Sequence, residues 1–169
     1  MSIIATDLDG TIFKGQTLID GVKEGLLKII NEGIEIYYTT NNSSQTPSEI
    51  KDKLEYLLQL NIDISKIITP LVIFQNLYSD NNLNIFIYGS DNLKKYIKNL
   101  NMNVTSLENA ELVLIGRKEE NNFSEINEII KSVSIGKNIL SLNKDLTFPT
   151  EFGEKAGNGA VVKIIEDEL

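Results

Sequence analysis

The sequence predicts an α/β fold in which strands and helices alternate. Apolar runs typical of strands occur at residues 2–8, 34–39, 85–88, 111–115 and 138–142. Helical patterns occupy residues 20–32, 46–58, 70–78, 92–100 and 123–133. This alternation favours parallel strands with helical crossovers. The chain has 169 residues, 41% of them hydrophobic, which is enough for one sizeable core or two smaller ones.

Each element in the first half has a local signal. Residues 2–8 predict a buried strand that ends in the turn-forming sequence Asp-Leu-Asp-Gly. Residues 20–32 carry apolar side chains at helical spacing, and Gly33 follows as a stop. Thr46-Pro47-Ser48-Glu49 is typical of a helix start, because Thr46 can cap, Pro47 needs no amide partner and Glu49 can close a capping box. Thr69-Pro70 repeats the cap-and-proline signal.

The polar turn formers at residues 79–82 predict the main internal boundary. They divide the chain into a first domain at residues 1–78 and a second α/β domain at residues 79–169. A last helix is expected at residues 160–165. Gly157-Asn158-Gly159 just before it is interpreted as a helix start in preference to a phosphate cradle.

Composition excludes several classes of function. The formal net charge of −8, with dispersed lysines, disfavours nucleic acid and anionic membranes as partners. No run is apolar enough to cross a bilayer, and the first residues do not resemble a secretion signal, so a cytoplasmic location is expected. The chain has neither cysteine nor histidine, so its chemistry depends on carboxylates, hydroxyls, amides and lysines.

Asp7 and Asp9 are the first candidate catalytic residues. Side chains two apart at a strand end point to the same side, so these carboxylates should converge while Leu8 faces the core. One carboxylate could attack phosphorus while the other protonates the leaving oxygen and later activates water. Mg²⁺, which prefers oxygen ligands, would offset the repulsion between carboxylate and phosphate.

Two other interpretations of this pair were weighed. A bare Asp-x-Asp could simply be an acidic turn at the top of a strand. A calcium-binding loop that starts at Asp7 would need glycine at its sixth position and glutamate at its twelfth, and the chain has Ile12 and Leu18 there. The calcium loop is therefore excluded.

A second polar cluster, residues 37–44, follows the next strand. Thr40 could donate its hydroxyl to a phosphoryl oxygen, and the Asn41 amide could add a second donor. Alternatively, these residues turn the chain and cap the next helix. The Asp7 and Asp9 pair at the neighbouring strand end favours the phosphate-binding interpretation, because ligands of open α/β sheets bind outside the carboxyl ends of strands.

The sequences Asp7-Leu8-Asp9-Gly10-Thr11-Ile12 and Thr40-Asn41-Asn42-Ser43-Ser44 resemble the first two motifs of the haloacid dehalogenase superfamily. Residues 142–150, followed by Gly157-Asn158-Gly159, are similar to the cap domain of its p-nitrophenylphosphatase-like branch, which includes sugar-phosphate and phosphoglycolate phosphatases. The resemblance covers essentially the whole chain. It implies a Rossmann-like core, partial in this chain, with an inserted α/β cap.

The resemblance also implies roles for individual residues. Asp7 would be the nucleophile, Asp9 the general acid and base, and Thr40 a phosphate ligand. Mg²⁺ would be bound by the Asp7 side chain and the Asp9 carbonyl. In the cap, Asn143 and Asp145 match the substrate-facing loop, although they could equally form a turn that fixes this loop.

The chain departs from this family in one respect. Relatives return from the cap to the core and supply a phosphate-steadying lysine and an acidic metal-binding motif there, whereas this sequence stops at Leu169 before either is expected. Neither Lys155 nor Lys163 matches that lysine. We therefore expect a fragment, a natural truncation, or a chain completed by a partner such as a second copy.

Three functions follow from these observations. The first is a magnesium-dependent phosphatase of small phosphorylated metabolites that works through an aspartyl-phosphate. The second is a catalytically incomplete relative that binds a phosphorylated ligand or a partner chain. The third, phosphoryl transfer to an acceptor other than water, shares the same nucleophile.

Overall fold

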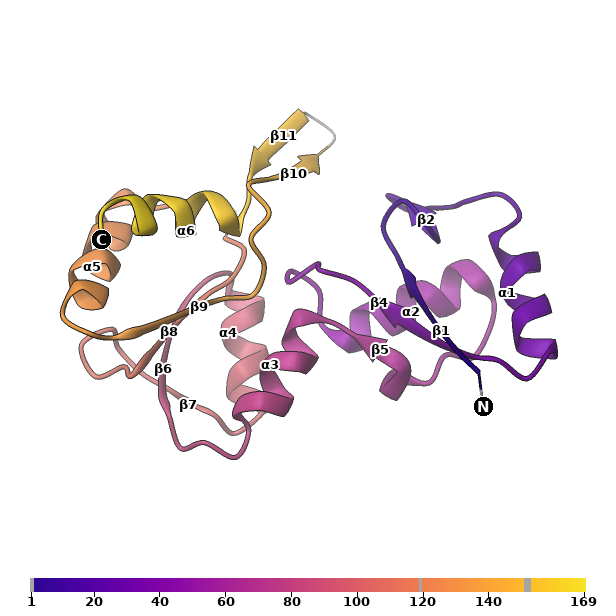
Figure 1. Cartoon of the computed structure of the whole chain (residues 1–169), viewed down its shortest axis with the longest axis horizontal. Coiled ribbons are helices and arrows are strands. Elements are labelled where there is room, and N and C mark those ends of the chain that lie inside the picture. The colour runs from indigo at the N-terminus through magenta and orange to yellow at the C-terminus, as the bar shows by residue number, and fades with distance from the viewer. Residues whose placement is uncertain (1, 119, 151–152) are drawn as a thin grey trace. The chain divides into compact units, whose positions relative to one another are not determined.

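The chain folds into two compact α/β units, residues 1–73 and 74–169. The structure is a computed structural model that describes residues 2–118, 120–150 and 153–169. The units divide within helix α3 (Pro70–Tyr78), whereas the expected boundary lies just after that helix. The α/β class is confirmed, because both main sheets consist of parallel strands joined by helices (Figure 1).

The first unit is built around a parallel sheet with the order β1-β4-β5, formed by β1 (Ile3–Asp7), β4 (Glu35–Thr39) and β5 (Ile67–Ile68). A short hairpin of β2 (Phe13–Lys14) and β3 (Thr17–Leu18) precedes α1 (Val22–Asn31). Helix α2 (Pro47–Leu58) and the 3-10 helix η1 (Ile64–Lys66) connect β4 to β5. The polar segments that follow β1 and β4 therefore lie at one edge of this sheet.

Helix α2 forms for the reasons its sequence indicates. The Thr46 hydroxyl accepts the Glu49 amide at 3.3 Å, and the Glu49 carboxylate accepts the Thr46 amide at 2.7 Å, so the predicted capping box is present. Ile50, Leu54 and Leu58 recur at helical spacing and are buried in the core of the unit. The cap and the apolar face together fix where α2 begins and how it is rotated.

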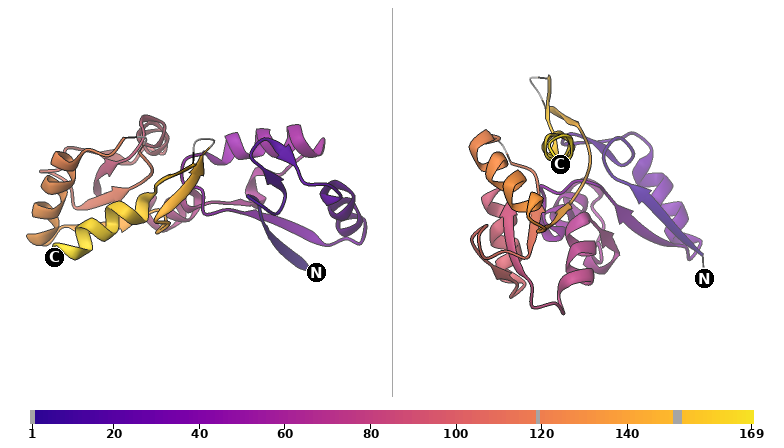
Figure 2. Two further views of the ribbon diagram at one scale, coloured as in Figure 1. Left: turned by 90° about the horizontal axis from the view of Figure 1, so that it is seen from above. Right: turned by 60° about the vertical axis from the view of Figure 1, so that its left-hand side comes forward.

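The second unit contains a parallel sheet with the order β7-β6-β8-β9. Its strands are β6 (Asn84–Tyr88), β7 (Asn103–Val104), β8 (Leu112–Ile115) and β9 (Asn138–Ser141). Its helices are α4 (Asp91–Asn99), α5 (Phe123–Ser134) and α6 (Asn158–Asp167). An antiparallel hairpin of β10 (Thr147–Thr150) and β11 (Gly153–Ala156) precedes α6. Helices α5 and α6 lie side by side over a core that includes Val113 and Ile129 (Figure 2).

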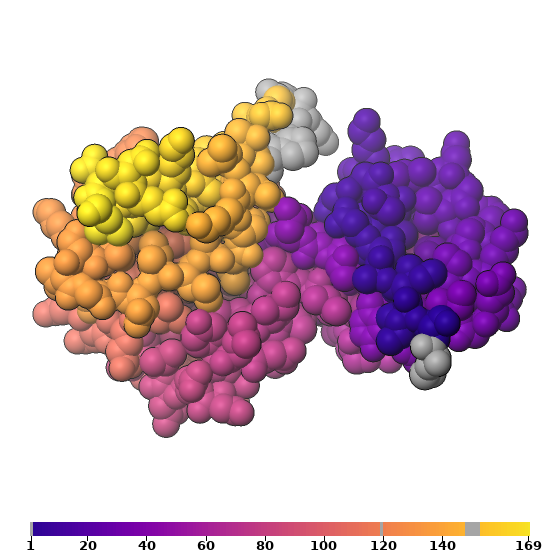
Figure 3. Space-filling view, viewed as in Figure 1, coloured from indigo at the N-terminus to yellow at the C-terminus, as the bar shows by residue number. Residues whose placement is uncertain are grey.

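Strand β1 differs from the prediction of a buried strand. Ile3 is 60% exposed and Ile4 is 37% exposed. The physical reason is that β1 is an edge strand, paired with β4 alone, and no described element of the first unit covers it. The N-terminal segment accordingly lies at the surface in the space-filling view (Figure 3). Among the described residues, no helix combines the length and apolar character needed to cross a bilayer.

Candidate active site

The site begins where β1 ends. Asp7 is the last residue of β1 and lies opposite Thr39 in the parallel register with β4. Leu8 is buried at 1% exposure, whereas Asp7 and Asp9 on either side of it face solvent. This is the predicted alternation, with the apolar residue anchored in the core and both carboxylates on the solvent side.

A tight turn holds the second carboxylate. The Leu8 carbonyl accepts the amides of Thr11, Ile12 and Phe13 at 3.2, 2.9 and 3.2 Å, and the Gly10 amide donates to the Phe13 carbonyl at 2.8 Å. Gly10 has a φ of 83°, a conformation that side chains other than glycine rarely adopt. The backbone that carries Asp9 is therefore fixed by hydrogen bonds within the turn.

The environment of Asp9 favours its protonated form. The pKa of the Asp9 carboxyl is raised above its ordinary value of 3.8, chiefly because the surrounding protein withdraws water from it. The Lys53 charge lowers this pKa, and the Asp7 charge raises it. The balance keeps a proton on Asp9 to higher pH than on an ordinary aspartate, as a general acid requires.

Thr40 lies immediately beyond β4, on the strand next to Asp7. It is buried at 9% exposure, and its amide donates to the Ile68 carbonyl at 3.1 Å. Its hydroxyl oxygen accepts the Asn42 amide at 3.0 Å, which leaves the hydroxyl proton for donation to another acceptor. The strand register thus places Thr40 one residue beyond the position opposite Asp7, and its role as a phosphate ligand stays a prediction.

The Asn42 side chain helps to organise the loop that follows. The Asn42 side-chain oxygen accepts both the Ser44 amide at 2.9 Å and the Ser44 hydroxyl at 2.6 Å. This arrangement turns the chain towards the start of α2, which is the alternative role expected from the sequence of residues 37–44. Asn41 is exposed. Its role as a second phosphate donor stays a prediction.

Asn143 and Asp145 lie in the second unit, in the loop between β9 and β10. The Asp145 amide donates to the Asn143 side-chain oxygen at 3.4 Å, and the Asn143 carbonyl accepts the Ser141 hydroxyl. Asn143 is half-buried and Asp145 is exposed. These contacts stabilise the loop itself, as the alternative interpretation expected, and their proposed contact with substrate stays a prediction.

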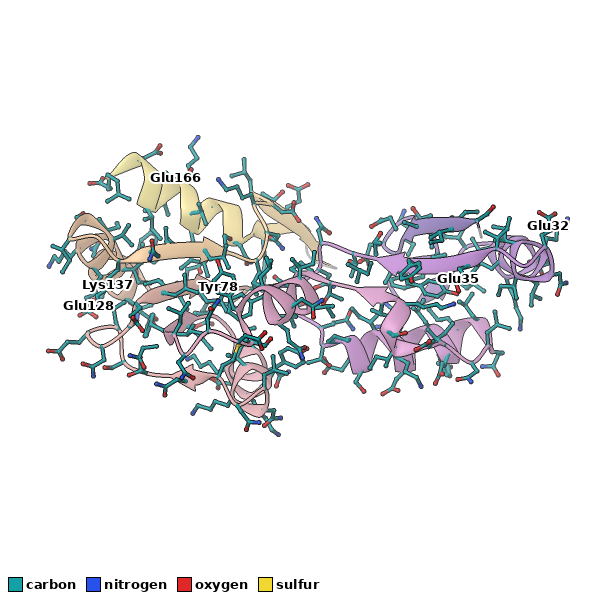
Figure 4. The ribbon with its side chains drawn as sticks, turned by 60° about the horizontal axis from the view of Figure 1, so that its bottom comes forward. Glu32, Glu35, Tyr78, Glu128, Lys137 and Glu166 are labelled. Carbon is teal, nitrogen blue, oxygen red and sulfur yellow. The ribbon has the colours of Figure 1, made fainter. Side chains whose placement is uncertain are left out.

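The start of α6 holds this loop in place. The Gly157 amide donates to the Leu146 carbonyl at 2.8 Å, and the Gly159 amide donates to the Asp145 carbonyl at 2.9 Å. A Cβ atom on Gly159 would lie 2.1 Å from the Lys144 carbonyl oxygen, so only glycine permits this approach. An ion pair of 3.1 Å between Lys144 and Glu166, which projects from α6, adds to this connection (Figure 4).

These features agree with one known family. The sequence profile of the haloacid dehalogenase-like hydrolases matches residues 4–103, which is more than half of the chain. The chain belongs to the haloacid dehalogenase-like hydrolases. The family that the Asp7 and Thr40 motifs indicate is therefore confirmed.

Known relatives of this haloacid dehalogenase-like chain are phosphatases. An acid sugar phosphatase of Staphylococcus haemolyticus is 30% identical over 163 residues, which cover 94% of this chain and 61% of that protein. The p-nitrophenyl phosphatase of Archaeoglobus fulgidus has the same fold, with a TM-score of 0.87 at 22% identity over 97% of this chain and 63% of that one. A glycerol phosphate phosphatase of Mycobacterium tuberculosis, solved with magnesium, has a TM-score of 0.82 at 22% identity over 99% of this chain and 51% of that one. The chain thus spans less than two thirds of the length of these relatives.

The donor set of the haloacid dehalogenase-like site suits Mg²⁺. Asp7 and Asp9 offer carboxylate and carbonyl oxygens at one strand end, and Mg²⁺ is commonly held by one or two carboxylates, several waters and a substrate phosphate. Within the described part of the chain, no three acidic, histidine or cysteine side chains gather around a common point. Asp7 and Asp9 can therefore supply part of a magnesium site, in which water and phosphate would provide further oxygen ligands.

Sequence reasoning missed Lys53 on α2. Its charge acts on Asp9, although the two residues lie far apart in the sequence. One signal was available, since Lys53 immediately precedes Leu54 on the buried face of a predicted helix and so borders the core. That pattern alone does not indicate which neighbour the ammonium group meets.

Proposed function

We propose that this chain provides the nucleophile and the general acid of a magnesium-dependent phosphatase that acts on small phosphorylated metabolites. The observation that supports this most directly is the arrangement at the end of β1, where Asp7 and Asp9 flank the buried Leu8 beside the strand that leads to Thr40. Membership of the haloacid dehalogenase-like hydrolases supports the same chemistry.

In the first half-reaction, the Asp7 carboxylate attacks phosphorus and the bond from phosphorus to the leaving oxygen breaks. Asp9 transfers its proton to that leaving oxygen, and its raised pKa supports this role. In the second half-reaction, the Asp9 carboxylate takes a proton from water, and the resulting hydroxide attacks the phosphorus of the aspartyl-phosphate. Inorganic phosphate leaves and the Asp7 carboxylate is restored.

Thr40 would donate its hydroxyl proton to a phosphoryl oxygen, and Asn41 would add an amide donor. The Asp7 side chain and the Asp9 carbonyl would hold Mg²⁺. When bound, this ion offsets the negative charge of carboxylate and phosphate as they approach each other. Such compensation is needed in a chain whose formal net charge is −8.

The proposed substrate class rests on the relatives, which are phosphatases of sugar phosphates, p-nitrophenyl phosphate and glycerol phosphate. Asn143 and Asp145 are the proposed contacts to the leaving group, on a loop whose backbone is already held by Gly157 and Gly159. A loop fixed in this way would present the same side chains to each substrate.

A second candidate function is a relative that binds a phosphorylated ligand, or a partner chain, without turnover. The observation that favours it is that the described residues gather no third metal-binding side chain near Asp7 and Asp9. Magnesium would then be held weakly, and binding would occur without efficient hydrolysis.

The Asp7→Asn variant tests the proposal. We expect it to lose magnesium-dependent hydrolysis of p-nitrophenyl phosphate by at least about a thousandfold, because an amide cannot form the aspartyl-phosphate. Asp52→Asn, which removes an exposed carboxylate on α2, is the matched control and should hydrolyse as the unaltered chain does. Substantial turnover by Asp7→Asn would place the nucleophile elsewhere, and absence of turnover in the unaltered chain would favour the binding function.

A further inference from the structure

Lys53 has an unusual position for a lysine on a helix surface. It lies on α2 between the buried residues Ile50 and Leu54, and it is half-buried. Its ammonium nitrogen lies 3.6 Å from the centroid of the Phe13 ring, well within the range of a cation–π interaction. Phe13 is itself buried at 2% exposure and belongs to the core of the first unit.

The Phe13 ring belongs to the turn that carries Asp9. The backbones of Asp9 and Phe13 form an isolated β-bridge, and the Gly10 amide donates to the Phe13 carbonyl at 2.8 Å. A side chain that holds the Phe13 ring therefore also restrains the backbone of Asp9. Lys53 connects α2 to the turn at this point.

The charge of Lys53 also reaches Asp9. The pKa of Lys53 is lowered by burial and raised by the Asp9 charge, and the pKa of Asp9 is in turn lowered by Lys53. No carboxylate among the described residues lies within 4.0 Å of the Lys53 nitrogen. The ammonium group thus acts on Asp9 without forming a close ion pair that would occupy the carboxylate oxygens.

Lys51 on the same helix makes a different kind of contact from that of Lys53. Its ammonium nitrogen forms an ion pair of 2.9 Å with Glu55, one turn further along α2. This is the ordinary use of a surface lysine on a helix and contributes little to stability. Lys53 instead lies over an aromatic ring of the active-site turn.

We propose that Lys53 is a positioning residue that seats the turn at residues 8–13 through its contact with the Phe13 ring and so fixes the backbone that carries Asp9. The inference rests on the proposed function in assigning Asp9 to proton transfer. It assigns Lys53 no contact with substrate, so its effect should appear in turnover and not in substrate binding.

The first test is kinetic and compares Lys53→Met with Lys53→Arg. Methionine keeps the length and packing of the side chain but removes the charge, whereas arginine keeps the charge and stacks on aromatic rings. We expect Lys53→Met to lower kcat for p-nitrophenyl phosphate by about ten- to a hundredfold with little change in KM. Lys53→Arg should retain most of kcat, and Lys51→Met should leave it unchanged. Full kcat in Lys53→Met, or an equal loss in both Lys53 variants, would overturn the inference.

The second test does not need turnover. Denaturant midpoints are measured for the unaltered chain, for Lys53→Met, for Phe13→Leu and for the double variant. If Lys53 acts through the Phe13 ring, the lysine substitution lowers the midpoint less in the Phe13→Leu background than in the unaltered chain. Lys51→Met combined with Phe13→Leu should be additive. Additive midpoints for the Lys53 pair would overturn the inference even if the chain proved inactive, whereas failure of Asp7→Asn to abolish turnover would count against the proposed function alone.

Discussion

Single residues at the end of β1 combine structural and chemical roles. Leu8 anchors the strand end in the core, and this burial holds the carboxylates of Asp7 and Asp9 towards solvent. The alternation could be predicted from sequence because it depends only on neighbouring residues. The contact of Lys53 with Phe13 could not, because it depends on how α2 packs against the turn.

The raised pKa of Asp9 leads to a prediction about stability and pH. An acid whose pKa is raised by folding favours the protonated form in the folded state, so its stabilising effect is complete below the ordinary value of 3.8 and is lost as pH rises through the raised value. The asparagine of Asp9→Asn cannot ionise, so this variant does not lose stability in this way as the pH rises. Its unfolding free energy, relative to the unaltered chain, should therefore increase between about pH 3 and about pH 7.

Urea titrations at a series of pH values would check this expectation. A difference between Asp9→Asn and the unaltered chain that stays constant with pH would contradict the assigned environment of Asp9.

At the scale of elements, long helices and central strands follow their sequence patterns closely. Helix α2 begins at the predicted Pro47, and α6 begins at Asn158 within the sequence interpreted as a helix start. The short elements were not predicted, namely the β2–β3 hairpin, β5, β7 and the β10–β11 hairpin. Of these, β2, β3, β5 and β7 have two residues each, which is too short to show a periodicity in the sequence, and they form by pairing with neighbouring backbone. The exposure of β1 was not predicted for a different reason. Apolar composition indicates a strand but does not indicate whether both of its faces are covered.

The contact between α6 and the loop at residues 143–146 predicts a large effect for Gly159→Ala. The new methyl group would meet the Lys144 carbonyl at 2.1 Å, so the loop or the helix start must move. We expect a loss of about 1–3 kcal/mol in unfolding free energy of the second unit, with faster hydrogen exchange at the first α6 amides.

Gly25→Ala provides the control for Gly159→Ala. Gly25 lies within α1, and a Cβ there would meet no atom within 4 Å, so alanine should be neutral or stabilising by up to about 1 kcal/mol. If Gly159→Ala left the unfolding free energy and the hydrogen-exchange rates unchanged, the loop would be easily displaced. The proposal that it holds Asn143 and Asp145 in a fixed position would then be wrong.

The whole chain comprises two units that each have a parallel sheet and a core of their own. The α/β class could be predicted from the order of strands and helices, whereas the units divide within α3 and not at the expected boundary after it. The assignment of the first unit to the catalytic core and of the second to a cap stays a proposal. Partners are also proposals, and the candidates are a small phosphorylated metabolite and either a second copy or a completing chain.

The exposed edge of the first unit predicts self-association of the 169-residue chain. An apolar edge strand with unpaired backbone groups favours strand addition by another molecule, and Ile3 is 60% exposed on β1. Sedimentation velocity should show the mean mass rising with protein concentration. Ile3→Lys should reduce this association, whereas Ile135→Lys, at a position 81% exposed in the second unit, should not. A monomer at every protein concentration would show that the exposed edge strand β1 does not pair with a second chain.

The register of β1 against β4 makes the candidate active site sensitive to changes in chain length. Asp7 lies opposite Thr39, one residue before Thr40, so the relation between carboxylate and hydroxyl is set by the number of residues in each strand. Inserting one alanine between Ile4 and Ala5 would either shift this pairing or exchange the two faces of the strand, which would turn Leu8 outward and the carboxylates inward. Length changes in β1 should therefore abolish turnover more completely than apolar substitutions at Ile3 or Ile4. Insertion scanning read out by phosphatase activity would test this, and natural variation at this site should take the form of substitution and not of insertion or deletion.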